Sequence, residues 1–297
     1  MDILLAAVNA KYIHTNLAVY SLRAYCREFS RRISLREYTI NQGKDQILKD
    51  IYHRAPRVLC FSCYIWNISY VKELIRDIHK ILPDTIIWTG GPEVSYDPEN
   101  FLQEMPEVFG VMLGEGEETF RKLVEYYVNS KEEEGLYKIP GICFRGKEGT
   151  VNSGFPDVLD MDRLVFPYED LSSFSHKILY YESSRGCPFS CSYCLSSVDK
   201  KLRFKSLDRV KKELEIFLEA KVSQVKFVDR TFNCREDHAL EIWRYIQDHD
   251  NGVTNFHFEI GADLLTEKEI ALIRTMRPGL IQLEIGVQST NEKTLKE

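Results

Sequence analysis

Short apolar runs alternate with amphipathic segments along the first 128 residues of this 297-residue chain. Five of the apolar runs have the length and composition of strands: residues 3–8, 33–40, 58–63, 85–89 and 108–113. The segments between them have helical periodicity, at residues 17–29, 42–53, 68–82, 98–104 and 117–128, with Asn16 and Asn67 placed as N-caps. Strict alternation of this kind is typical of parallel strands joined by crossover helices. This half of the chain therefore predicts an α/β fold, a doubly wound parallel sheet of the Rossmann type.

Polar residues and glycines follow the predicted strands of this sheet. They are Asn9, Ser62, the turn Gly90, Gly91 and Pro92, and the segment Gly114, Glu115, Gly116 and Glu117. Doubly wound sheets bind ligands at the carboxyl ends of their strands, where glycine lets a ligand approach the backbone. These positions predict a ligand-binding edge, with simple tight turns as the alternative.

The periodicity lapses after residue 129 and resumes near residue 177. We expect residues 130–176 to form a linker, with a small hairpin near 139–151. Four further strands are predicted at 178–182, 224–229, 255–260 and 280–286, with helices at 207–220, 236–248 and 267–276. Four strands cannot close a barrel, and an unpaired last strand would be an open edge. The expected domains are an open sheet at 1–129 and the N-terminal part of a β/α barrel at 177–297, in a chain that is part of a longer protein.

Composition and charge exclude several classes of protein. The 39 basic residues are outnumbered by 45 acidic ones, which argues against a nucleic-acid partner. No apolar run is long enough to span a bilayer, and the first apolar run follows Asp2 instead of a basic region. We therefore expect no membrane partner and a cytoplasmic location, where cysteines serve as thiols more often than as disulfides.

Three cysteines crowd the loop that follows the first strand of the second half. Cys187, Cys191 and Cys194 have the spacing C-x3-C-x2-C. A structural zinc site takes four ligands, whereas a 4Fe-4S cluster held by three thiolates leaves one iron open to a further ligand. The spacing favours such a cluster. Unrelated thiols, or a zinc site completed by His176 or Cys234, remain alternatives.

Cys60 and Cys63 form a C-x2-C pair within a predicted strand. Residues three apart on an extended strand face opposite sides, so the two thiols cannot chelate one ion together. We predict that both are core thiols.

The cysteine loop, with Tyr193 directly before its third cysteine, resembles the radical S-adenosylmethionine (SAM) superfamily. The preceding domain, with its GGP turn and GEGEETF segment, is similar to the cobalamin-binding domain of one subgroup. The resemblance implies that Cys187, Cys191 and Cys194 hold a 4Fe-4S cluster whose open iron binds SAM. It implies cofactor contacts at three further residues, Asp229, Glu259 and Gln288, and a shielding role for Tyr193.

In the first domain the resemblance implies cobalamin held by Ser62, Gly90, Gly91, Gly114 and Glu115. The family signature that supplies a histidine to cobalt, D-x-H-x-x-G, is not present after the first strand, where the chain reads NAKYIH. We therefore expect cobalamin without a protein histidine below the cobalt, and His14 is an outside candidate for a contact.

The resemblance implies reductive cleavage of SAM to a 5'-deoxyadenosyl radical and methylation of an unactivated centre in a small-molecule substrate. A radical rearrangement or cyclisation without methyl transfer is the alternative, and an iron-sulfur electron carrier or a zinc-stabilised adaptor would be non-enzymatic. An external one-electron donor such as flavodoxin or ferredoxin is the implied partner.

Overall fold

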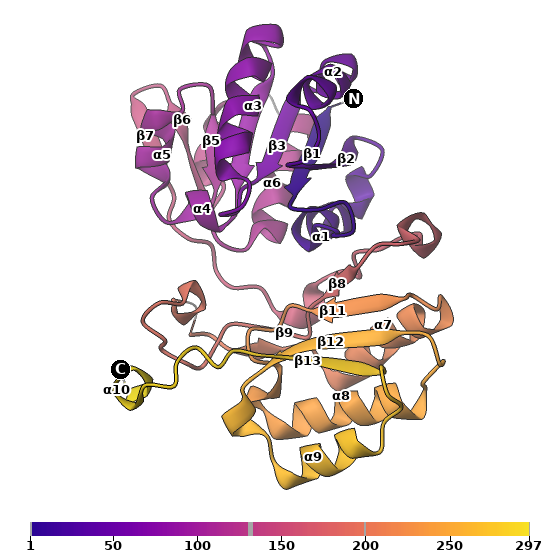
Figure 1. Cartoon of the computed structure of the whole chain (residues 1–297). Coiled ribbons are helices and arrows are strands. Elements are labelled where there is room, and N and C mark those ends of the chain that lie inside the picture. The colour runs from indigo at the N-terminus through magenta and orange to yellow at the C-terminus, as the bar shows by residue number, and fades with distance from the viewer. Residues whose placement is uncertain (1, 130–132, 199, 297) are drawn as a thin grey trace. The chain divides into compact units, whose positions relative to one another are not determined.

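The computed structural model describes residues 2–129, 133–198 and 200–296. The chain forms two compact units: one comprises the residues up to 159 with 164–169, and the other comprises 160–163 with the residues from 170 onward. Each unit has its own sheet (Figure 1). Among the described residues no helix has both the length and the apolar character needed to cross a bilayer.

The first unit is a three-layer α/β/α sandwich. Its strands are β1 (Ile3–Asn9), β2 (Ile33–Thr39), β3 (Val58–Ser62), β4 (Ile86–Gly90), β5 (Gly110–Met112), β6 (Ile142–Gly146) and β7 (Gly149–Asn152). Its helices are α1 (Leu17–Tyr25), α2 (Lys44–Arg54), α3 (Ile68–Ile81), α4 (Pro92–Ser95), α5 (Pro98–Glu104) and α6 (Gly116–Asn129). The strand order is β2-β1-β3-β4-β5-β6-β7, and the first five strands are parallel. This confirms the predicted doubly wound sheet.

Strand β1 shows how the two faces of this sheet are covered. Leu4, Ala6 and Val8 pack in a core with residues of α2, α3 and α5. The alternate residues of the strand pack instead with α1 and α6. A strand buried on both faces is apolar on both, which explains why β1 has no polar alternation from Ile3 to Val8 and reaches a polar residue only at its last position, Asn9.

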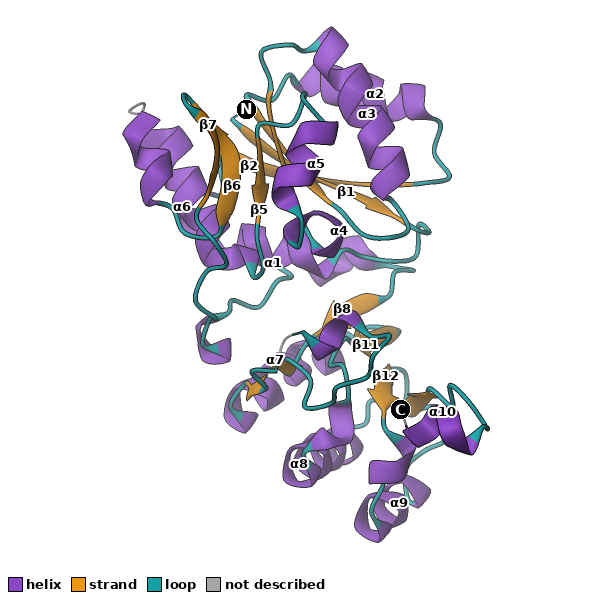
Figure 2. Cartoon of the chain, turned by 90° about the vertical axis from the view of Figure 1, so that its left-hand side faces the viewer, coloured by secondary structure: helices purple, strands orange, loops and turns teal. Residues whose placement is uncertain are grey.

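Two short strands come from the stretch expected to be a linker. The hairpin β6–β7 pairs antiparallel with β5 and extends the sheet at its edge (Figure 2). The hairpin itself was predicted, but its place beside β5 was not. Helix α6 lies between β5 and β6, as it would in a parallel unit, so the order of the elements does not reveal that β6 runs antiparallel to β5.

The two predicted N-caps differ. The side chain of Asn16 accepts a hydrogen bond from the Val19 backbone N–H at 3.3 Å, as expected. Asn67 precedes α3 but caps no helical N–H. Its amide instead donates to the carbonyl oxygens of Val8 and Ser62, so it ties β1 and β3 together.

The second unit has a parallel sheet with the strand order β13-β12-β11-β8. Neighbours in the sheet are neighbours in the sequence, as in a β/α barrel. These strands are β8 (Leu179–Tyr181), β11 (Gln224–Phe227), β12 (Asn255–Ile260) and β13 (Ile281–Ile285), and the helices are α7 (Leu207–Glu219), α8 (Glu236–Asp248), α9 (Glu267–Arg274) and α10 (Glu292–Lys296). A separate two-stranded ribbon joins β9 (Ser184–Arg185) and β10 (Arg203–Phe204).

Alternate residues of β11 and β12 divide between two faces. Phe227 and Phe258 are buried, and both rings contact Phe232, with centroids 5.3 and 4.3 Å away. Phe258 also contacts Trp243 of α8, with centroids 5.8 Å apart. Figure 2 shows α8 and α9 on the same side of the strands. The opposite face has partly exposed polar residues, as the inner wall of an incomplete barrel would.

Candidate functional site

The cysteine loop begins three residues after Ser184. Cys187 is buried, Cys194 is half-buried and Cys191 is exposed, and none of the three is in a disulfide. The N–H of Cys194 donates to the Cys191 carbonyl oxygen at 3.1 Å, which closes a turn between two of them. Within the described residues no three Cys, His, Asp or Glu side chains are grouped closely enough to hold a metal ion. The donor set fits an iron-sulfur cluster because three thiols share one loop, although their sulfur atoms do not converge.

Both ends of this loop are fixed by backbone pairing. The ribbon β9–β10 pairs Ser184 with Phe204 and Arg185 with Arg203. The loop between the two strands therefore leaves the ribbon and returns to it at the same place. Gly186 has φ +90°, and a Cβ there would lie 2.7 Å from the Lys201 carbonyl oxygen. Only glycine fits at this close crossing of the two ends.

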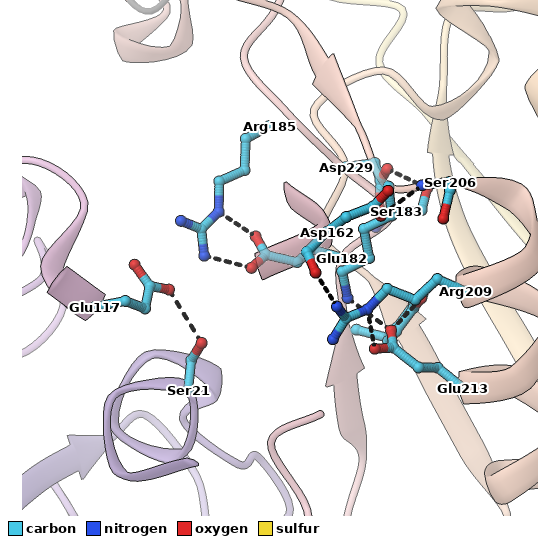
Figure 3. A network of polar contacts seen from close by, with 12 residues as sticks. Ser21, Glu117, Asp162, Glu182, Ser183, Arg185, Ser206, Arg209, Glu213 and Asp229 are labelled. Atoms are coloured by element: carbon cyan, nitrogen blue, oxygen red, sulfur yellow. Dashed lines mark hydrogen bonds and ion pairs between the residues drawn. The ribbon is translucent and has the colours of Figure 1, made fainter. Parts of the chain in front are cut away.

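Asp229, predicted to contact SAM, lies just beyond β11 with 1% of its surface exposed. Its carboxylate accepts hydrogen bonds from the Ser183 N–H at 3.0 Å, from Ser183 Oγ at 2.6 Å and from Ser184 Oγ at 2.5 Å. Figure 3 shows its contact with Ser183. Burial raises the pKa of Asp229, and the hydrogen bonds from the two serines oppose that rise.

A second buried polar group, which sequence reasoning missed, lies where the loop returns. Glu213 of α7 accepts from Lys205 Nζ at 2.8 Å, from Tyr181 OH at 2.7 Å and from Arg209 Nε at 2.9 Å. The Lys205 ammonium lies 4.4 Å from the centroid of the Tyr181 ring. Burial, followed by the charge of Glu213, raises the pKa of Tyr181 well above its ordinary value. The signal was present in the sequence, because Arg209 lies four residues and Lys205 eight residues before Glu213, about one and two helical turns.

The other predicted SAM contacts are on the polar face or in loops. Glu259 of β12 lies 3.1 Å from Lys226 Nζ, and Glu284 of β13 lies 2.9 Å from the same atom. Burial disfavours the charge of Lys226, but the two carboxylates raise its pKa overall. Gln288 is exposed at φ +59°, and Tyr193 is exposed. The structure therefore brings Glu259 into an ion-pair cluster and brings neither Gln288 nor Tyr193 to it.

The predicted cobalamin residues lie at or just beyond the carboxyl ends of β3, β4 and β5 of the first unit. Gly91 has φ +110°, and a Cβ there would lie 2.5 Å from the Cys63 carbonyl oxygen, whereas a Cβ on Gly90 would meet Met112 at an ordinary 3.4 Å. Gly114 also has positive φ, at +62°. Ser62 is buried with its Oγ 3.3 Å from Asn16 Nδ2, and Glu115 accepts from the Leu159 N–H at 3.2 Å.

An aromatic pair follows β3 at the same edge of the sheet and was not predicted. The rings of Tyr64 and Trp66 stack with centroids 4.4 Å apart and an interplanar angle of 7°. Trp66 is 46% exposed, and Ile65 between them is exposed. A flat apolar surface at the carboxyl end of a strand suits a flat macrocycle such as a corrin. The run YIW directly after a strand was the available signal.

Cys60 and Cys63 are core thiols, as predicted. Cys63 packs in the core beside α2 and α3, and Cys60 packs in the core on the other face of the sheet. Burial raises the pKa of each thiol to about 12, so neither is a thiolate near neutral pH.

Comparison with known proteins identifies both units. The B12 binding domain model matches residues 3–124, and the radical SAM superfamily model matches residues 181–297. The chain is 29% identical over 192 residues to the cobalamin-dependent radical SAM methyltransferase TokK of Streptomyces tokunonensis, which covers 60% of this chain and 28% of the relative. It is 27% identical over 240 residues to the anaerobic magnesium-protoporphyrin IX monomethyl ester cyclase of Synechocystis sp., which covers 76% of this chain and 46% of the relative.

A solved structure has the same fold. The cobalamin-dependent S-adenosylmethionine radical enzyme OxsB, with aqua-cobalamin and S-adenosylmethionine bound, superposes with a TM-score of 0.79 at 20% identity over 99% of this chain and 45% of that one. The chain thus spans less than half the length of these relatives. The chain belongs to the radical SAM superfamily, in the cobalamin-dependent group that carries a B12-binding domain before the radical SAM domain.

Proposed function

We propose that this chain provides the cobalamin-binding and cluster-binding parts of an enzyme that cleaves SAM reductively and methylates an unactivated centre. The observation that carries the proposal is the loop with three thiols, those of Cys187, Cys191 and Cys194, which is fixed at both ends beside the end of β8. When bound, the cluster would supply the electron that cleaves SAM to methionine and a 5'-deoxyadenosyl radical, and cobalamin would carry the methyl group.

The residues of the second unit would bind and orient SAM. Glu259 is the best candidate of those predicted, because its half-exposed carboxylate lies on the polar face of the sheet, where a ligand has access. Gln288 and Tyr193 lie on exposed segments and would act only after these close over the cofactor. Lys226 would hold Glu259 and Glu284 in place in either case, since its ammonium contacts both carboxylates.

The first unit would hold cobalamin at the carboxyl edge of its sheet. Gly91 and Gly114 leave the backbone open to a close approach, and the stacked pair of Tyr64 and Trp66 offers a flat surface. Ser62 and Glu115 would contribute mainly by shaping the loops, because their side chains already bond Asn16 and the backbone of Leu159. The first loop reads NAKYIH and lacks the signature D-x-H-x-x-G, so no histidine of this loop would ligate the cobalt.

A small-molecule substrate and an external one-electron donor complete the proposal. Cyclisation without methyl transfer is the second candidate, because one relative is a cyclase that matches 76% of this chain. Both reactions would use the same cluster loop, so the loop does not decide between them.

Product analysis decides between the two reactions. The full-length protein is reconstituted anaerobically with iron, sulfide and cobalamin, and then given SAM, a strong reductant and candidate substrates. Methyl transfer predicts 5'-deoxyadenosine together with S-adenosylhomocysteine and a product heavier by one methylene. Cyclisation predicts 5'-deoxyadenosine without S-adenosylhomocysteine. An iron-sulfur electron carrier would consume no SAM, and a zinc adaptor would contain zinc in place of iron, and either result would refute the proposal.

A further inference from the structure

We propose that Asp229 is a positioning residue that fixes the start of the cluster loop through Ser183 and Ser184, and that it is not a ligand of SAM. This inference rests on the proposed function, which assigns the loop to an iron-sulfur cluster. It replaces the role that the family resemblance implies for Asp229.

The carboxylate of Asp229 accepts hydrogen bonds from the two residues that lead into the loop. Three donors lie within 2.5–3.0 Å of it, and all three belong to Ser183 and Ser184. These serines come four and three residues before Cys187. Asp229, Ser183 and Ser184 are 1%, 0% and 6% exposed, so the contact is closed to water. A hydrogen bond to a buried charge is stronger than one between neutral groups, and all three bonds here end on one carboxylate.

The direction of these bonds extends the network to His238 of α8. An ionised carboxylate only accepts, so Ser183 Oγ donates its single proton to Asp229. His238 Nε2 lies 3.0 Å from the same Oγ and must therefore donate to it. His238 is 2% exposed and its pKa is lowered to about 4, chiefly by burial and then by the charge of Arg235, which keeps the ring neutral. The chain of donors runs from His238 through Ser183 to Asp229.

Ser183 also holds the other end of the loop. Its carbonyl oxygen accepts from the Lys205 N–H at 2.8 Å, directly after β10. Lys205 is in turn held by Glu213 of α7. Ser183 is thus the residue at which the outgoing and returning strands of the loop meet, and any shift of Ser183 moves both. Because Asp229 bonds both the N–H and the hydroxyl of Ser183, it controls this point.

Burial also separates Asp229 from the residues able to meet SAM. For the amine of SAM to bond Asp229, the residues that enclose this carboxylate would have to move apart, because only 1% of the residue is exposed. Glu259, by contrast, has 37% of its side chain exposed. The geometry thus assigns ligand contact to the exposed carboxylate and loop positioning to the buried one.

The test compares Asp229→Asn and Ser184→Ala in the full-length protein reconstituted with iron and sulfide. Two quantities are measured: the rate at which a chelator removes the cluster, and the Kd for SAM per cluster from the change in the cluster's electron paramagnetic resonance (EPR) spectrum. Loss of one hydrogen bond to a charged group corresponds to about a tenfold change in an equilibrium. We expect cluster loss about tenfold faster in both variants, with the Kd for SAM changed less than about twofold.

Two further variants act as controls. Ser184→Thr keeps the hydroxyl and should restore wild-type cluster retention, which a general loss of packing would not allow. Asp237→Asn makes the same chemical change at an exposed carboxylate paired with Arg235, and it should leave both quantities unchanged. Wild-type retention in Asp229→Asn with a Kd for SAM raised tenfold or more would overturn the inference and restore Asp229 as a SAM ligand.

A measurement on the iron-free protein separates this inference from the proposed function. Hydrogen exchange of residues 183–187 should be faster in Asp229→Asn than in the wild type, with or without iron. If the wild-type protein binds no cluster, the proposed function fails, and the exchange result still decides whether Asp229 holds the loop. Unchanged exchange in this segment would refute the positioning role.

Discussion

Replacing Gly91 by alanine should destabilise the B12-binding unit, while the same change at Gly90 should not. Gly91 has φ +110° and ψ 173°, a region that is essentially restricted to glycine and costs other residues about 1–3 kcal/mol. The new Cβ would also lie 2.5 Å from the Cys63 carbonyl oxygen and 3.1 Å from the Cys63 nitrogen, both in the backbone. Strain and clash together predict a loss of about 3 kcal/mol or more in the free energy of unfolding of this unit.

Gly90 provides the matched control because it is adjacent and lies within β4. Its Cβ would make only an ordinary contact of 3.4 Å with Met112, so we expect a change within about 1 kcal/mol. Hydrogen exchange of the β3 and β4 amides under native conditions measures the stability of this unit separately from the other. Equal stability of the two variants would refute the reasoning, because it would show that the turn between Gly91 and Cys63 adjusts without cost.

Three further outcomes are expected. Lys205→Met removes a buried ammonium from Glu213 and should lower the free energy of unfolding of the second unit by about 3 kcal/mol, measured by hydrogen exchange of the α7 amides. The double variant Lys205→Met, Glu213→Gln should recover part of this loss, because it no longer leaves a buried carboxylate without its lysine. The pKa of His238 is about 4 in the folded chain and 6.5 in the unfolded chain, so the unfolded chain binds more protons between these two pH values. The free energy of unfolding of the radical SAM unit should therefore fall as the pH drops from about 6.5 to 4, by up to about 3 kcal/mol. A pH profile with the same slope in His238→Gln would contradict this assignment. Trp66→Ala removes one ring of the stacked pair and should weaken cobalamin binding about tenfold, followed by the visible spectrum, with unchanged far-ultraviolet circular dichroism.

The fold was largely predictable because its strands and helices alternate with a regular period. Every parallel strand of both sheets lies where an apolar run predicted it. The two-residue strands β9 and β10 could not be found this way, since a segment of two residues has no periodicity. Their pairing depends on the closed loop between them, which is a contact between residues distant in sequence.

The sequence predicts which thiols share a loop, but it does not predict the surroundings of the candidate carboxylates. The spacing of Cys187, Cys191 and Cys194 places them on one loop without any knowledge of the fold. Burial decides what a carboxylate does, however, and a sequence does not show it: Asp229 is enclosed by two serines, whereas Glu259 is half-exposed beside Lys226. Both were predicted as cofactor contacts on the same grounds.

The central claim is that three thiols of one loop hold a cluster with an iron that binds SAM. EPR spectroscopy of the reduced, reconstituted protein with and without SAM tests it most directly. We expect the signal of a reduced 4Fe-4S cluster that shifts when SAM is added and is lost in each of Cys187→Ala, Cys191→Ala and Cys194→Ala. A cluster signal that SAM leaves unchanged, or one that survives these three substitutions, would contradict the account.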